Sequence, residues 1–262
     1  MSRFLWRFMT LLVLAGVAGC GNWPDEVPEQ VSVDEPSAGS AVVPAERDLV
    51  PAVSEQIQAV REGDASRIEL AEPLSEDEWE TLQGLEGLEE LVLAGGGLDD
   101  AGTGRLATLP ALRKLVARDS PLTDAGFAVL ATCGSLQEIN VPQAACTAEG
   151  VASLAALSNL RSLRIGSPQL QGAEVCHAVV ALPKLKFLHL VEIEIGDEGL
   201  AVLEQRPDLW SLYLDGAGVS DEAWARYFHA CPQVHVHVDQ LHHDRDPGGD
   251  HDGHTSATPP SS

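Results

Sequence analysis

Residues 112–130 have the sequence LRKLVARDSPLTDAGFAVL, and this stretch joins two different hydrophobic periods. In its first half Leu115 and Ala117 are apolar and two positions apart, which is the period of a short strand with one buried face. The second half begins at Thr123 and Asp124 and places apolar residues at Phe127 and Leu130, at helical spacing. Thr123 suits a helix N-cap, and the Asp124 carboxylate would meet the positive end of the helix dipole. The stretch therefore predicts a strand, a turn and a capped helix.

The same unit recurs about every 24 residues along the chain. The first buried strand residue of each copy is Ile68, Leu91, Leu115, Ile139, Leu163, Leu188, Leu212 and, in a degenerate last copy, Val236. A unit this short cannot bury its own apolar side, so it is stable only when stacked on its neighbours. One strand and one helix per copy predict an α/β fold, a right-handed solenoid with a parallel sheet.

The copies resemble those of leucine-rich repeat proteins, and Leu122-Thr-Asp-Ala-Gly-Phe127 is similar to the ribonuclease-inhibitor-like and cysteine-containing subfamilies. Cys133 and Cys231 stand where the cysteine-containing pattern has its cysteine. The resemblance covers roughly two thirds of the chain and implies a horseshoe, a scaffold that serves many unrelated binding tasks. The copy at 170–175 lacks the Thr-Asp pair, so we expect a looser coil there.

The beginning of the chain resembles a bacterial lipoprotein signal. A short cationic start is followed by an apolar run over residues 8–17 and by small residues before Cys20. The resemblance implies that residues 1–19 are removed and that Cys20 is lipidated. A membrane-spanning helix is the first alternative, but the run is about ten residues long and a bilayer needs about 20. A secretory peptide that releases the protein is the second.

The lipid anchor would place the protein outside the cytoplasm, on the membrane of a bacterial cell envelope. Gly21, where an aspartate would signal retention, favours the outer membrane. Residues 20–50 are acidic and rich in proline without a sustained period, which predicts a disordered tether. Residues 51–240 form the repeat domain, and Val53, Ile57 and Val60 predict a helix that caps its first coil.

Residues 241–262 are predicted to be a disordered tail rich in histidine and aspartate. Its candidate metal ligands are His242, His243, Asp244, His251 and His254. Imidazole and carboxylate groups together suit a borderline metal ion. The alternative is a solvated polar tail, because its glycines and proline leave the ligands unfixed and ordering them would cost entropy.

Composition excludes several classes of function. The chain has 40 acidic and 16 basic residues and a net charge of −24, which argues against nucleic acid as a partner. Besides Cys20 it has four cysteines, and the spacing of Cys133 and Cys231 puts them too far apart for a disulfide, so we expect buried thiols. We find no catalytic or phosphate-binding motif and expect no enzyme and no cofactor. The aspartate of each Thr-Asp pair is better explained by helix capping than by calcium binding.

The strands of a curved solenoid line its concave face, so the residues between the buried leucines point to a partner. Seven of the 16 basic residues lie in or beside the middle strands, and aromatic side chains gather farther along. The candidate contact residues are Lys114, Arg118, Asn140, Arg164, Phe187, His189, Trp210 and Tyr213. Exposed aromatic groups flanked by cations are common in interfaces. The alternative is that the strands are basic only because the helix caps take the acids, and that Trp210 packs on its neighbouring coil.

These observations favour a membrane-anchored protein that binds an unknown protein partner through its concave face. Two other functions stay open. One is an envelope protein that binds metal through its tail, and the other is a surface protein that binds carbohydrate through its aromatic group.

Overall fold

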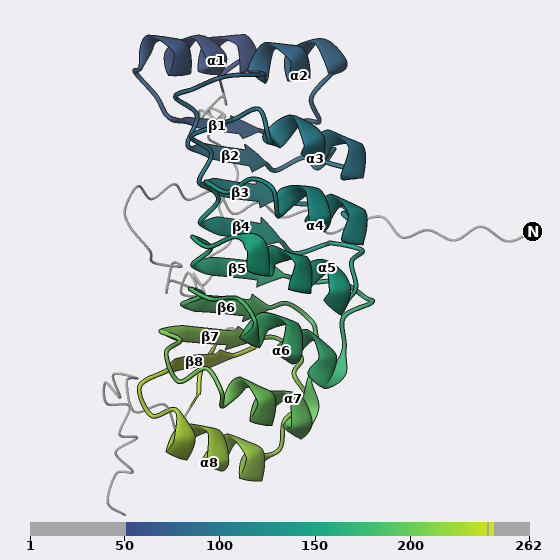
Figure 1. Cartoon of the computed structure of the whole chain (residues 1–262), viewed down its shortest axis with the longest axis vertical. Coiled ribbons are helices and arrows are strands. Elements are labelled where there is room, and N and C mark those ends of the chain that lie inside the picture. Colours follow the sequence, from purple (N-terminus) through teal and green to yellow (C-terminus); the bar gives the residue numbers. More distant parts are fainter. Residues whose placement is uncertain (1–50, 240, 244–262) are drawn as a thin grey trace, which may run out of the picture. The chain divides into compact units, whose positions relative to one another are not determined.

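The computed structural model describes residues 51–239 and 241–243, in which helices and strands alternate along the chain (Figure 1). The strands are β1 (Arg67–Leu70), β2 (Glu90–Leu93), β3 (Lys114–Ala117), β4 (Glu138–Val141), β5 (Ser162–Ile165), β6 (Phe187–Leu190), β7 (Ser211–Leu214), β8 (His235–Val238) and β9 (Leu241–His242). The helices are α1 (Val53–Glu62), α2 (Glu76–Leu82), α3 (Asp100–Leu106), α4 (Asp124–Leu130), α5 (Ala148–Ser153), α6 (Gly172–Val180), α7 (Gly196–Leu203) and α8 (Asp221–Ala230). A short 3-10 helix, η1 (Leu154–Ala156), extends α5.

The strands β1 to β8 form one parallel sheet in sequence order, and β9 adds an antiparallel strand at its end. The register confirms the predicted stacking, since Leu115 pairs with Ile139 and Ile139 pairs with Leu163. The predicted first buried residues, from Ile68 to Val236, all lie in this one row across β1 to β8. The described part is therefore an α/β leucine-rich repeat solenoid.

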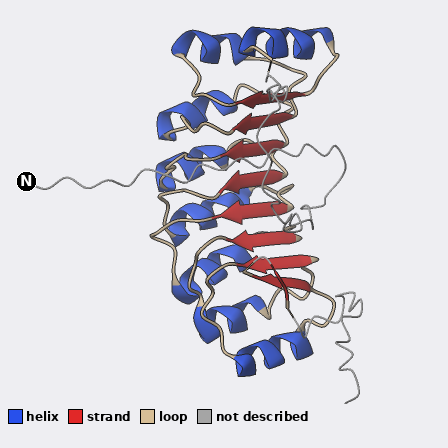
Figure 2. Cartoon of the chain, turned by 180° about the vertical axis from the view of Figure 1, so that it is seen from behind, coloured by secondary structure: helices blue, strands red, loops and turns tan. Residues whose placement is uncertain are grey.

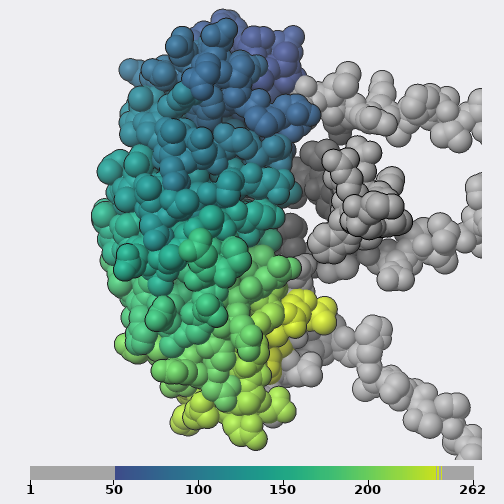
Figure 3. All heavy atoms as spheres, turned by 90° about the vertical axis from the view of Figure 1, so that its right-hand side faces the viewer, coloured from purple at the N-terminus to yellow at the C-terminus, as the bar shows by residue number. Residues whose placement is uncertain are grey.

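The sheet forms one side of the solenoid and the helices form the other (Figure 2). The helices follow a longer arc than the strands do, so the strands line the inner, concave side (Figure 1). Colours that follow the sequence run as successive bands along the surface, because each coil packs mainly on the coils before and after it (Figure 3). This arrangement leaves one face of the strands directed away from the core.

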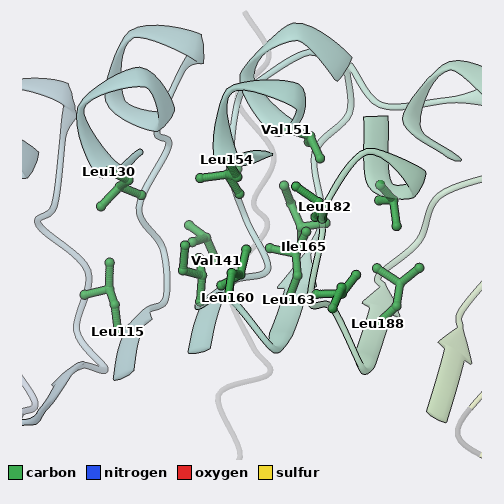
Figure 4. Close-up of a cluster of buried hydrophobic side chains, with 14 of the residues drawn as sticks. Leu115, Leu130, Val141, Val151, Leu154, Leu160, Leu163, Ile165, Leu182 and Leu188 are labelled. Carbon is green, nitrogen blue, oxygen red and sulfur yellow. The ribbon is translucent and has the colours of Figure 1, made fainter. Parts of the chain in front are cut away.

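The core lies between the sheet and the helices and is continuous from coil to coil (Figure 4). Leu115, Leu163 and Leu188 point into it from the strands, while Leu130 and Leu154 meet them from the helical side. All five are fully buried. A buried leucine contributes about 1.5–3 kcal/mol relative to an exposed one, and each coil obtains this burial only from its neighbours.

Side chains cap most of the helices as predicted. Thr123 accepts a hydrogen bond from the backbone N–H of Ala125, and Ser75 forms a capping box with Glu78. The prediction is wrong for α7, which follows Ile195 without a side-chain cap and begins with Gly196 at a φ of 62°. A left-handed conformation suits glycine, so the backbone turn stands in for the cap there.

The coil at 170–175 differs from the looser coil that we expected. Helix α6 indeed has no side-chain cap at Gln171. It is nevertheless nine residues long, and Val175, Cys176 and Val179 are fully buried in the common core. Packing against both neighbouring coils therefore compensates for the missing cap.

Both ends of the solenoid are covered. Helix α1 buries Ile57 and Val60, as predicted, and the Gln56 side-chain amide both donates to and accepts from the backbone of Glu69 on the edge strand β1. At the other end β9 pairs with β8, and the His243 ring packs 4.8 Å from that of Trp224. The repeat domain was predicted to end at residue 240, and these contacts involve Leu241 to His243. Within the described range no helix is long and apolar enough to cross a membrane.

Candidate binding surface

The outward face of the sheet carries two rows of side chains. The central row consists of the third residue of each strand from β2 to β8, which the register aligns: Val92, Val116, Asn140, Arg164, His189, Tyr213 and His237. The flanking row consists of the first residues: Glu90, Lys114, Glu138, Ser162, Phe187, Ser211 and His235. Six of the eight predicted contact residues belong to these rows. Arg118 directly follows β3, and Trp210 directly precedes β7.

The predicted aromatic group is present, in two parts. The rings of Phe187 and Trp210 meet edge to face with centroids 5.5 Å apart, and the Trp210 side chain remains 58% exposed. Along the central row the Tyr213 ring stacks on His237 at 4.2 Å and lies 5.4 Å from His189. Stacked rings hold each other in one orientation, so this end of the surface is rigid and aromatic.

His189 is not exposed, contrary to our expectation of an exposed aromatic side chain. Its side chain is buried, and its Nε2 lies 2.8 Å from the Oδ2 of Asp215. Asp215 directly follows β7, so it reaches back over the neighbouring strand β6. His189 therefore supports Tyr213 from the side, and Trp210 is the aromatic residue that a partner meets first.

The strand face is less basic than we expected, because glutamates and aspartates balance several of its cations. Lys114 lies between two acids, with its Nζ 3.3 Å from Glu90 and 3.9 Å from Glu138. Lys186 pairs likewise with Asp208 at 2.8 Å. Lys114 is therefore a weak candidate for a partner's carboxylate.

Arg118 and Arg164 form the part of the strip that stays basic. Burial lowers the pKa of the Arg164 guanidinium, and the nearby charge of Arg118 lowers it further, against a smaller opposite effect of Asp215. The two guanidiniums are thus close enough to repel each other. Arg118 is exposed and makes no ion pair within the described residues.

Two polar residues that matter to this region were not anticipated. Asp215 holds His189, and its place directly after a strand, equivalent to that of Arg118 after β3, was a usable signal. Arg206 is buried and donates hydrogen bonds to the backbone carbonyls of Leu182 and Leu185 at 2.8 and 2.7 Å. The sequence carries no periodic signal for it.

The helical side uses its aspartates for structure. Asp124 accepts hydrogen bonds from the backbone N–H and the hydroxyl of Thr147 in the next coil, at 2.7 and 2.8 Å. Asp100 bonds Thr123 in the same way, and Asp197 bonds Ser220. Each aspartate therefore ties its own helix start to the next cap, a link between coils that our capping interpretation did not include.

The four cysteines of the repeats are free and buried, as predicted: Cys133, Cys146, Cys176 and Cys231. Burial raises the pKa of Cys146, and also that of Cys176, to about 12. Such thiols stay protonated near neutral pH, so they pack as small apolar side chains.

The remaining candidates fall mostly outside the described residues. This holds for Cys20, Asp244, His251 and His254. The backbone of His242 lies in β9, and His243 packs at the C-terminal end of the solenoid. In the described part of the chain no group of three or more histidine, cysteine, aspartate or glutamate residues could hold a metal ion.

Comparisons of the sequence with models of protein families and with curated proteins find no match. The solved structures that are similar to the chain include three that follow. An internalin C2 of Listeria monocytogenes shares 24% identity over 60% of this chain and 64% of its own, with a TM-score of 0.45. An internalin (inlF) of the same organism shares 21% identity over 64% of this chain and 53% of its own, with a TM-score of 0.47. A leucine-rich repeat protein of Leptospira interrogans shares 18% identity over 69% of this chain and 50% of its own, with a TM-score of 0.44. The chain thus spans between half and two thirds of these proteins.

Proposed function

We propose that this chain is a non-enzymatic interaction protein that binds another protein through the concave face of its strands. The observation that carries the proposal is the exposed indole of Trp210, held edge-on by Phe187 beside the stack of His189, Tyr213 and His237. A large aromatic side chain that stays exposed on a rigid support can be buried by a partner at little cost in side-chain entropy.

The shape of the surface supports the same function. A stacked array presents a long open face instead of an enclosed cavity, and such a face suits a partner that contacts several coils at once. Along the central row the side chains change from valines through Asn140 and Arg164 to the aromatic stack. The row thus offers a partner polar recognition in its middle, between two valines on one side and the aromatic stack on the other.

We further propose that the protein acts outside the cytoplasm, anchored to a bacterial envelope membrane by lipid on Cys20. The support is the sequence that leads to Cys20, a cationic start, an apolar run of about ten residues and small residues before the cysteine. Two or three acyl chains hold a domain stably on a membrane, whereas a single chain does so only marginally. Gly21 favours the outer membrane.

The binding surface can be tested by crosslinking in intact cells. A photo-crosslinking residue placed at Ser211, beside Trp210, should give a discrete adduct in the parent protein. Trp210→Ala and Tyr213→Ala should each reduce that adduct several-fold, while His177→Ala on the exposed part of α6 should not. An adduct of equal yield in all four proteins would show that the aromatic group is not the contact.

The anchor is tested separately by growing cells with labelled palmitate. The parent protein should take up label and sediment with membranes, and Cys20→Ser should lose both properties. Label that persists in Cys20→Ser would place the lipid elsewhere, and a parent protein that is unlabelled and released would support a plain secretory signal.

A further inference from the structure

Arg118 and Arg164 lie on the same face of the sheet, with Asn140 between them. Asn140 in β4 pairs with Val116 on one side and with Arg164 on the other. Arg118 is two residues after Val116, and side chains two residues apart along a strand share a face. Adjacent strands are about 4.8 Å apart, so two long arginine side chains can meet above the strand that separates them.

The charges around this pair are unusual for so acidic a chain. The two cations act on each other, and burial together with Arg118 lowers the pKa of Arg164. Two adjacent positive charges destabilise each other unless an anion lies near both. The Asp215 carboxylate acts on Arg164 in the opposite direction and more weakly, and its Oδ2 lies 2.8 Å from the Nε2 of His189.

Other cations on this face contrast with the pair. Lys114 is held between Glu90 and Glu138, and Lys186 is held by Asp208. Arg118 has no such acid in the described part of the chain. The chain has 40 acidic residues, so an acid beside Arg118 would be expected if this position served only the fold.

Asn140 adds a second kind of demand. Its Oδ1 is buried and accepts no hydrogen bond from the residues that the structure describes. A buried polar atom without a partner is unfavourable, so a ligand that donates a hydrogen bond to this oxygen would be stabilised. Chloride and sulfate supply no donor, whereas a peptide segment supplies a backbone N–H as well as a carboxylate.

We propose that Arg118, Arg164 and Asn140 form a binding site for an acidic peptide segment, in which both guanidiniums hold one carboxylate and Asn140 accepts an N–H. The proposal rests on the protein-binding function proposed above and specifies the chemistry of the partner. Charge-assisted hydrogen bonds from two arginines favour a planar carboxylate, which both can bind at once.

The test is a titration of the full-length chain with acetylated hexaglutamate, followed through the side-chain Nε–H signals of its arginines by NMR at physiological salt. Hexaglutamine and inorganic phosphate are the comparison probes. The signals of Arg118 and Arg164 should move with hexaglutamate and should move much less with the other two. Arg226, exposed on α8, is the internal reference. In Arg118→Gln the shift of Arg164 should fall several-fold, while Arg226→Gln should leave it unchanged.

Equal shifts with hexaglutamine, equal or larger shifts with phosphate, or movement no greater than that of Arg226 would overturn the site. The crosslinking described above separates this result from the wider function. If Arg118→Gln and Arg164→Gln leave the adduct at Ser211 intact while Trp210→Ala reduces it, the acidic site is wrong and the protein-binding surface stands. If none of the three variants changes the adduct, the binding surface itself is wrong.

Discussion

Gly150 lies so close to the Asp124 carboxylate of the preceding coil that an added Cβ would stand 2.4 Å from its Oδ1. The backbone N–H of Gly150 donates to that same oxygen at 3.1 Å. An added Cβ on Gly126 would likewise stand 2.4 Å from the Oδ1 of Asp100. At these two positions glycine is therefore required by the aspartate one coil earlier, because the aspartate carboxylate occupies the space of a Cβ.

Gly150→Ala should therefore destabilise the protein by about 1–3 kcal/mol, because the new methyl group displaces the carboxylate that holds Thr147. Urea unfolding at neutral pH measures the effect. In an Asp124→Ala background the same substitution should cost clearly less, since the clash is gone. Gly104→Ala, with no atom within 4 Å of its added Cβ, should be neutral or stabilise by about 0.4–1 kcal/mol. Equal effects at the two glycines would contradict this account.

Arg206→Met should cost about 2–4 kcal/mol, because it leaves several buried carbonyl groups near the end of α6 without their donor. Arg206→Lys should restore only part of the loss, since an ammonium cannot reproduce the planar fork of donors. The measurement is again the urea midpoint. Arg226→Met, at an exposed position on α8, should change stability by less than about 0.5 kcal/mol. Full rescue by lysine would show that charge alone matters at position 206.

Asp208 should contribute to the acid sensitivity of the protein. Hydrogen bonds from Arg206 and Lys186 hold the pKa of its carboxyl below the usual range. A lowered folded-state pKa adds stability above the unfolded value of about 3.9, and this stability is lost as the pH falls toward the folded value.

Asp208→Asn should therefore be less stable than the parent at pH 7, and the difference in stability between the two proteins should narrow below a pH of about 4. The side chain is 47% exposed, so the difference should stay within about 1 kcal/mol. Urea midpoints measured from pH 7 to pH 2.5 test this, with Glu86→Gln, an exposed acid, as the control. A gap that widens toward low pH would have the wrong sign.

The four buried cysteines should not react with a maleimide in the folded protein at pH 8. Burial keeps reagent away and raises the pKa of Cys146 and of Cys176 to about 12, so the thiolate is scarce. In urea all four should be modified, and a reducing agent should leave the unfolding midpoint of the native protein unchanged. Rapid modification without denaturant, or a midpoint lowered by reduction, would refute the buried free thiols.

Part of the candidate surface could be predicted from the repeats. The equal length of the copies places Asn140 beside Arg164 and Tyr213 beside His237, and the structure pairs them so. The balance of charge along that surface could not be obtained in the same way. Lys114 bridges to two glutamates and His189 to Asp215, and these contacts depend on how each side chain turns.

The sequence by itself determined the coil, the parallel order of the strands and the common core. The local spacing of apolar residues selects strand or helix. A unit of about 24 residues can bury those apolar residues only against a copy of itself. Tertiary structure alone decided that Arg206 serves the carbonyl groups of an earlier coil, that His189 is covered, and that the charge of Arg118 acts on Arg164. A long polar side chain has several possible partners within reach, and only the packing of the folded chain determines which of them it contacts.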